Sequence, residues 1–146
     1  MITQTVQIKA PIKTVYQVIT DFESYPKFLT EMKSAKIIWC DDSQVEVNFH
    51  IHLIKEVQYT LLFDLVPSHE LHWSLKQGEM MKTNDGFWGL KEIAENLTEA
   101  KYGIDVQLGL WVPKAITETL IEKDLPKTLK AFKKESERRF KSSQGE

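Results

Sequence analysis

Apolar and polar residues alternate with a period of two along most of the chain between residues 45 and 108. Successive side chains of a β-strand point to opposite faces, so this alternation predicts strands with one buried and one exposed face. The expected strands are residues 2–9, 35–40, 45–53, 55–66 and 71–76, one that begins at Gly86, and 100–108. Residues 77–85 are expected to form a loop. Short turns between the strands favour an antiparallel sheet with one apolar face.

A spacing of three and four residues predicts helices on either side of this strand-rich region. The first helix has an apolar face made of Ile12, Val15, Tyr16, Ile19 and Phe22, and a second short helix is expected around residues 25–32. A long helix is expected from Pro113 to Phe140, with Ile116, Leu120, Leu125, Leu129, Phe132 and Phe140 on its apolar face. Pro126 removes a backbone hydrogen bond inside this stretch and should kink the helix or divide it in two.

Composition indicates an ordinary globular protein. The 146 residues are 42% hydrophobic and 27% charged, which excludes disorder as the main interpretation and favours one domain over residues 1–146. Residues 142–146 are expected to be a frayed tail. We find neither a run of apolar residues long enough for a membrane span nor a secretory signal, so we expect a cytoplasmic protein. The single cysteine, Cys40, fits a reducing compartment.

Charge is unevenly spread along the chain. The formal net charge is −2, but residues 127–146 carry seven Lys or Arg and three Glu, which gives +4 there and −6 elsewhere. Cations favour the C-terminal end of a helix dipole, so a solvated helix end is the first interpretation. The alternative is a transient contact with an anionic membrane or with ribosomal RNA, and we expect no binding to DNA.

The expected order of elements is accompanied by local motifs: Ala10-Pro11 through Asp21, Tyr25-Pro26 with Phe28, Gly86-Phe87-Trp88, Val112-Pro113 and Leu125 through Leu129. Together these features resemble the helix-grip fold of the START-like superfamily. Within it the chain resembles the polyketide cyclase/dehydrase family, whose relatives include coenzyme Q-binding START proteins and bacterial ribosome-association toxins. The resemblance implies an α+β fold in which a long C-terminal helix packs across a curved antiparallel sheet of about seven strands. It also implies an apolar small molecule between sheet and helix, which some members cyclise or dehydrate.

Inward-facing residues of the expected strands and helices are the candidate ligand-binding residues. They are Tyr59, Leu61, Phe63, Trp73, Trp88, Leu90, Tyr102 and Ile104 on the sheet, and Ile116 and Leu120 on the long helix. Phe28, Met32 and Met81, with Met80, could form an adaptable mouth, because thioethers fit irregular apolar ligands. The alternatives are a solid, close-packed core and a mobile surface loop.

Few residues point to catalysis or to a metal. Tyr59 and Tyr102 could orient a carbonyl, and Glu92 shares the parity of Trp88, so it is the one carboxylate expected inside. The alternative for each tyrosine is a core residue whose hydroxyl reaches the rim. His50, His52 and His72 are expected on the solvated face without a completed ligand set, so we expect no metal site and no cofactor.

Three functions follow from these patterns. The first is non-covalent binding or transport of a hydrophobic small molecule, such as a lipid, an isoprenoid quinone or a polyketide-like compound, in a cavity between sheet and helix. The second is an enzyme of the cyclase/dehydrase type, which would need an acid or base within that cavity. The third is a ribosome-associated, toxin-like protein that contacts RNA through the basic end of its last helix.

Overall fold

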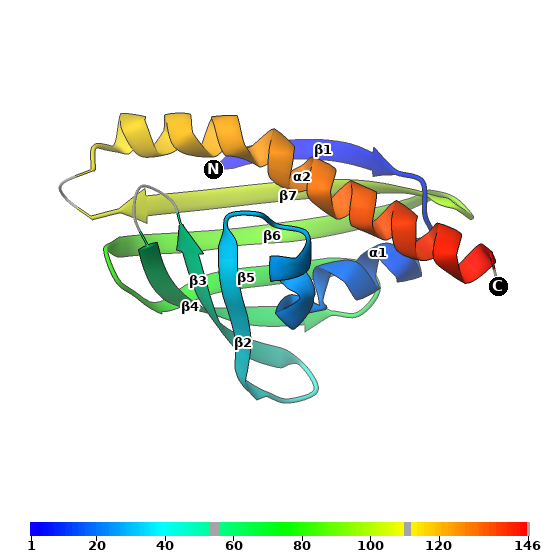
Figure 1. The fold of residues 1–146 in the computed structure, drawn as a ribbon, viewed down its shortest axis with the longest axis horizontal. Helices are drawn as coiled ribbons and strands as arrows, with labels where there is room; N and C mark the ends of the chain where they lie inside the picture. The colour runs from blue at the N-terminus through cyan, green and yellow to red at the C-terminus, as the bar shows by residue number, and fades with distance from the viewer. Residues whose placement is uncertain (53–55, 110–111, 146) are drawn as a thin grey trace.

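Seven antiparallel strands and one long helix make up most of the protein (Figure 1). The computed structural model describes residues 1–52, 56–109 and 112–145. Along the chain the elements are β1 (Ile2–Ile8), α1 (Ile12–Ile19), the 3-10 helix η1 (Phe22–Lys27), β2 (Met32–Cys40), β3 (Gln44–His52), β4 (Glu56–Val66), β5 (Glu70–Gly78), β6 (Met81–Ala94), β7 (Leu97–Leu108) and α2 (Lys114–Gln144). The described strands lie in the order β1-β7-β6-β5-β4-β3-β2, and α2 runs across one face of the sheet.

The seven strands lie where the sequence predicts them, but several bounds differ by up to three residues and one segment differs more. Residues 77–85, expected to be a loop, are mostly strand: β5 ends at Gly78, β6 begins at Met81, and Glu79 and Met80 form the turn. Met80 adopts a positive φ of 58°, and the β6–β7 register shifts between Met81 and Thr83. Such a bulge moves every following residue to the other face, which breaks the period-two pattern and hides the strand.

The helices differ in detail from the expectations. The second short helix is a 3-10 helix that ends at Lys27, and residue 32 already belongs to β2. The last helix is continuous through Pro126, and Figure 1 shows that its axis changes direction along its length. The expected kink is therefore present without a division. This helix runs to Gln144, beyond the expected end at Phe140. Leu53 and Lys55, assigned to strands from the sequence, lie outside the described residues.

Aromatic side chains hold η1 between the sheet and α2. Tyr25 stacks on Phe49 of β3 with ring centroids 6.0 Å apart and meets Phe132 of α2 edge-on at 5.2 Å. The Tyr25 hydroxyl donates a hydrogen bond to the carbonyl of Ile19, the last residue of α1. This bond fixes the angle at the junction of α1 and η1, which we call the corner. The corner and α2 therefore pack as one unit.

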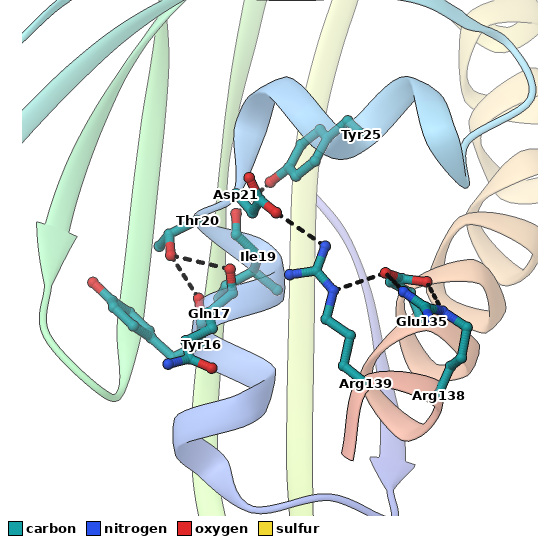
Figure 2. Close-up of polar contacts among 9 residues, drawn as sticks. All are labelled: Tyr16, Gln17, Ile19, Thr20, Asp21, Tyr25, Glu135, Arg138 and Arg139. Atoms are coloured by element: carbon teal, nitrogen blue, oxygen red, sulfur yellow. Dashed lines mark hydrogen bonds and ion pairs between the residues drawn. The ribbon is translucent and has the colours of Figure 1, made fainter. Parts of the chain in front are cut away.

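A polar network closes the same corner at the surface. Figure 2 shows the Arg139 guanidinium between Asp21 and Glu135: it donates to Asp21 Oδ2 at 3.0 Å and to Glu135 Oε2 at 2.7 Å. Arg138 makes two further hydrogen bonds to the Glu135 carboxylate, at 2.9 and 2.8 Å. Hydrogen bonds from Arg138 and Arg139 lower the pKa of Glu135 to about 2.

This network predicts a loss of stability in acid. The pKa of Glu135 is lower in the folded than in the unfolded chain, so its contribution is complete above about pH 5 and is lost as the pH falls towards 2. The loss is at most about 3 kcal/mol. Urea unfolding of wild type and Glu135→Gln between pH 7 and pH 3 measures it. Wild type should lose more stability over this range than Glu135→Gln, whereas the exposed control Glu122→Gln should follow wild type; equal acid sensitivity in all three proteins would contradict the assignment.

Candidate functional site

A cavity of about 370 Å³ lies between the inner face of the sheet and α2. Its position follows from how the two helices share that face. α1 packs against β6, β7 and the C-terminal half of α2, and so fills one end (Figure 1). Towards the other end α2 presents the short side chains of Thr128 and Ala131, which leave space above the sheet.

Most of the residues predicted to bind a ligand line this cavity. They are Phe28, Met32, Tyr59, Leu61, Phe63, Trp73, Met81, Trp88, Tyr102 and Ile104. Parity identified them because β4, β5 and β7 are regular enough for alternate side chains to share one face. Their lining position is a property of the fold, and ligand binding by them stays a prediction.

Three predicted lining residues lie elsewhere. Leu90 is buried further along β6, beyond Trp88, and belongs to the packed core. Ile116 is 50% exposed, and Leu120 lines a smaller adjoining pocket of about 100 Å³. The buried line of α2 instead begins at Thr117, because its hydroxyl bonds back to the Pro113 carbonyl at 3.4 Å and leaves its methyl group for the core. Hydrophobicity alone therefore placed the inner face of the helix one residue too early.

A second set of lining residues was not predicted from the sequence. They are Tyr25, Leu29, Thr30, Glu31, Phe49, Ile51, Asn84, Val106, Ile121, Asp124, Lys127, Thr128, Ala131 and Phe132. The apolar members lie on strands and helices that the sequence predicts. Their position at the cavity follows from how these elements pack in three dimensions. The polar members come from the η1–β2 connection, the bulged start of β6 and α2. There neither the strand period of two nor the helical spacing of apolar residues identifies them.

A fixed amide stands among the apolar walls. The indole Nε1 of Trp73 donates to Asn84 Oδ1 at 3.1 Å, and Asn84 is only 5% exposed. Trp73 is held in place by Gly86, where an added Cβ would lie 2.2 Å from Trp73 Cζ2. The indole ring thus lies directly on the backbone of β6, and its N–H is aimed at the amide. The bulge at Met81 is what turns Asn84 inward.

Two tyrosines bring hydroxyl groups to the cavity. Burial raises the pKa of Tyr59, and burial together with the neighbouring Tyr59 raises the pKa of Tyr102. Both hydroxyls therefore stay protonated at neutral pH. They can donate hydrogen bonds to a ligand, but neither is suited to act as a general base.

Carboxyl groups meet at the mouth of the cavity. Glu31, in the connection between η1 and β2, faces Asp124 and Lys127 of α2. Burial and the facing Asp124 carboxyl raise the pKa of Glu31, and Lys127 partly offsets this effect. A carboxyl group with a raised pKa can hold a proton nearer to neutral pH than an ordinary glutamate.

Glu92, the carboxylate expected inside, is instead exposed and is not part of the cavity wall. The pairing of β5 with β6 ends at Gly89, so Glu92 lies where β6 continues only with β7 as a projecting hairpin. Parity gave the correct side of the strand, because the paired residue Thr98 is buried, but Glu92 itself lies at the exposed end of the hairpin. The expectation that Glu92 lies inside the cavity is therefore wrong.

The histidines lie on the outer face of the sheet. β4 separates β3, which carries His50 and His52, from β5, which carries His72. His50 Nε2 lies 3.2 Å from Glu56, and His72 Nε2 lies 2.9 Å from Glu70. Within residues 1–52, 56–109 and 112–145, no three His, Cys, Asp or Glu side chains come together to hold a metal ion.

The solvent-facing side of α2 carries a line of cations. We call it the basic row: Lys123, Lys127, Lys130, Lys134, Arg138 and Lys141. The spacing of three and four residues puts all six on one side of the helix, and all are exposed. In the described part of the chain, no helix is long and apolar enough to cross a membrane.

Comparisons with known proteins agree with this architecture. A family model described as "Polyketide cyclase / dehydrase and lipid transport" matches residues 8–133. No curated protein sequence shows significant similarity to the chain. Among solved structures, a START superfamily protein from Mycobacterium smegmatis is 20% identical with a TM-score of 0.82, and the match covers 97% of each chain.

Two further structures are similar over nearly their whole length. The Zhui aromatase/cyclase from Streptomyces sp. R1128 is 18% identical with a TM-score of 0.83, covering 94% of this chain and 93% of that one. The protein TTHA0849 from Thermus thermophilus is 16% identical with a TM-score of 0.80, covering 97% of both chains. These likenesses confirm the helix-grip, START-like fold expected from the sequence. With the family match over residues 8–133, the chain belongs to the polyketide cyclase/dehydrase and lipid transport family.

Proposed function

We propose that the protein binds a compact hydrophobic molecule, without covalent catalysis, in the cavity beneath α2. The observation that carries the proposal is the volume of about 370 Å³ left among aromatic and aliphatic side chains of the sheet, η1 and α2. This volume is at the lower end of the range for small-molecule sites. It suits a compact ring system better than a complete long-chain isoprenoid or a phospholipid.

The energetics of burial support this proposal. A ligand that loses about 200 Å² of apolar surface to the cavity gains about 5 kcal/mol, before the cost of immobilising it is subtracted. Empty apolar space is also unfavourable for the protein, because the lining side chains lack contact partners there. A guest molecule would therefore stabilise the fold as well as being held by it.

Filling the cavity should abolish binding. Ala131 lines the cavity from α2, and a tryptophan there would occupy the space of a ligand. Ala131→Trp should weaken binding of an apolar fluorescent dye such as N-phenyl-1-naphthylamine by at least about tenfold. Ala115→Trp, on the exposed side of the same helix, is the matched control and should bind like wild type. Fluorescence titration measures both; the proposal fails if wild type binds no apolar dye, or if Ala131→Trp binds the dye as tightly as wild type does.

A second candidate function is cyclisation or dehydration of a carbonyl compound. It is favoured by one observation, the position of Glu31 in the cavity wall opposite Asp124, with a raised pKa. A protonated Glu31 could donate a proton to a leaving hydroxyl, and its carboxylate could accept one from an acidic carbon.

Product analysis separates the binding protein from the enzyme. Wild-type protein is incubated with a poly-β-ketone analogue, which is then recovered and analysed by mass spectrometry. The binding function predicts recovery at the rate of spontaneous reaction. A dehydrated or cyclised product that forms faster with wild type, and at the spontaneous rate with Glu31→Gln, would establish the enzyme. Glu79→Gln, an exposed glutamate of the β5–β6 turn, is the control.

The basic row supports a transient contact with an anionic membrane. Like charges at spacings of three and four residues destabilise an isolated helix slightly, and an anionic surface would offset that repulsion. Lys127 of this row also lines the cavity mouth, so the row lies next to the ligand site. Exposed Ile116 lies seven residues before Lys123 and so faces the same side. We expect cosedimentation with phosphatidylglycerol vesicles at low salt, lost at high salt and in Lys130→Glu/Lys134→Glu but not in Lys13→Glu/Lys36→Glu. Binding to ribosomal subunits without binding to vesicles would instead favour the RNA contact.

A further inference from the structure

The cavity wall has one polar group whose orientation is fixed by its neighbours. An indole N–H can only donate a hydrogen bond, so the atom of Asn84 that lies 3.1 Å from Trp73 Nε1 has to be the amide oxygen. The amide nitrogen then points the other way, towards Met81 Sδ at 3.7 Å. Asn84 and Met81 both line the cavity. The side chain therefore offers N–H groups, and not its carbonyl, to the interior.

These N–H groups are poorly satisfied by the protein. Their partner is a thioether sulfur, which is a weak acceptor compared with an oxygen. Asn84 is only 5% exposed, so little of its amide reaches bulk water. A buried donor without a good acceptor costs free energy that a ligand acceptor would restore.

A second donor lines the same space from β4, two strands away from β6. Tyr59 of β4 is 8% exposed, lines the cavity, and its hydroxyl makes no hydrogen bond with any described residue. Tyr102 of β7 also lines the cavity, and the centroid of its ring lies 5.4 Å from that of the Trp73 ring. The inner wall thus combines apolar contact area with hydrogen-bond donors, while the carboxyl groups of Glu31 and Asp124 are at the mouth.

We propose that the ligand is a hydrophobic ring compound with a carbonyl oxygen, and that Asn84 selects it by donating a hydrogen bond to that oxygen. This inference rests on the proposed binding function and specifies its ligand class. Apolar walls would bind any hydrocarbon of the right size, but only an oxygen acceptor satisfies the amide. Asn84 is therefore a specificity-determining residue, and Trp73 is a positioning residue that acts through it.

Two ligands that differ by one carbonyl test the proposal. 9-Fluorenone and fluorene have the same ring skeleton, so apolar burial is closely similar for both. Wild type should bind fluorenone about tenfold more tightly than fluorene, which is the typical value of one buried hydrogen bond. In Asn84→Leu, a substitution of similar size, the ratio of the two dissociation constants should fall to about one, with fluorene bound as well as before or better.

Thr98→Val is the matched control. Thr98 is completely buried and its hydroxyl bonds to the carbonyl of Ala10, outside the cavity wall. It reports the effect of removing a buried polar group on stability alone, and it should keep the wild-type preference for fluorenone. Displacement of N-phenyl-1-naphthylamine gives all the dissociation constants, and their ratio for each protein is insensitive to the fraction that is folded.

A spectroscopic measurement avoids reliance on the variant's stability. The side-chain amide signals of Asn84 in a ¹⁵N–¹H spectrum are assigned by their absence from Asn84→Leu, or by selective labelling if that variant does not fold. Fluorenone should shift them strongly and fluorene only weakly. Equal binding of the two ligands by wild type, or equal shifts of the Asn84 signals, would overturn the ligand class while leaving the binding function intact. Failure of both ligands and of the dye to bind would overturn the binding function itself.

Discussion

The position of Phe132 determines whether the protein has an interior space. Its ring meets Tyr25 and Phe28 edge-on at 5.2 Å each, and Trp88 of β6 at 5.1 Å. These rings are too large to compress, so they set the distance between α2 and the sheet. On the N-terminal side of Phe132, α2 carries short side chains such as Thr128 and Ala131. These side chains cannot fill the same separation between helix and sheet. The cavity is thus a consequence of one aromatic contact combined with small neighbours on the same helix.

The remaining features of the site depend on that separation. The Tyr25 hydroxyl and the Arg139 network hold the corner beside Phe132, so the helix cannot settle onto the sheet without breaking them (Figure 2). Because the space persists, Asn84 and Tyr59 line a cavity. Donors on the wall and carboxyl groups at the mouth give the cavity a direction along which a ligand with one polar end would align.

Much of the fold could be predicted from the sequence because β3, β4, β5 and β7 keep a regular period of two, which leaves little choice of face. The bulge at Met81 interrupts that period, so the sequence predicts a loop for the start of β6, which bears Asn84, and a strand only from Gly86. Thr117 was overlooked because a threonine that bonds its own helix behaves as an apolar residue, a property that composition does not reveal. Glu31 and Asp124 are far apart in the chain, so only the tertiary structure brings them together. Parity placed Glu92 on the correct side of β6 but could not show that this end of the β6–β7 hairpin is exposed.

A high-resolution crystal structure of gently purified protein, with no ligand added, would show whether α2 and the sheet enclose a guest molecule. We predict a space between α2 and the sheet, bounded by Phe132, Trp73 and Tyr102, that contains electron density for a small molecule carried through purification. Density for this molecule should approach the Asn84 amide nitrogen. A cavity closed by α2 lying lower on the sheet, or filled by the side chains of Trp73, Tyr59 and Tyr102, would contradict it.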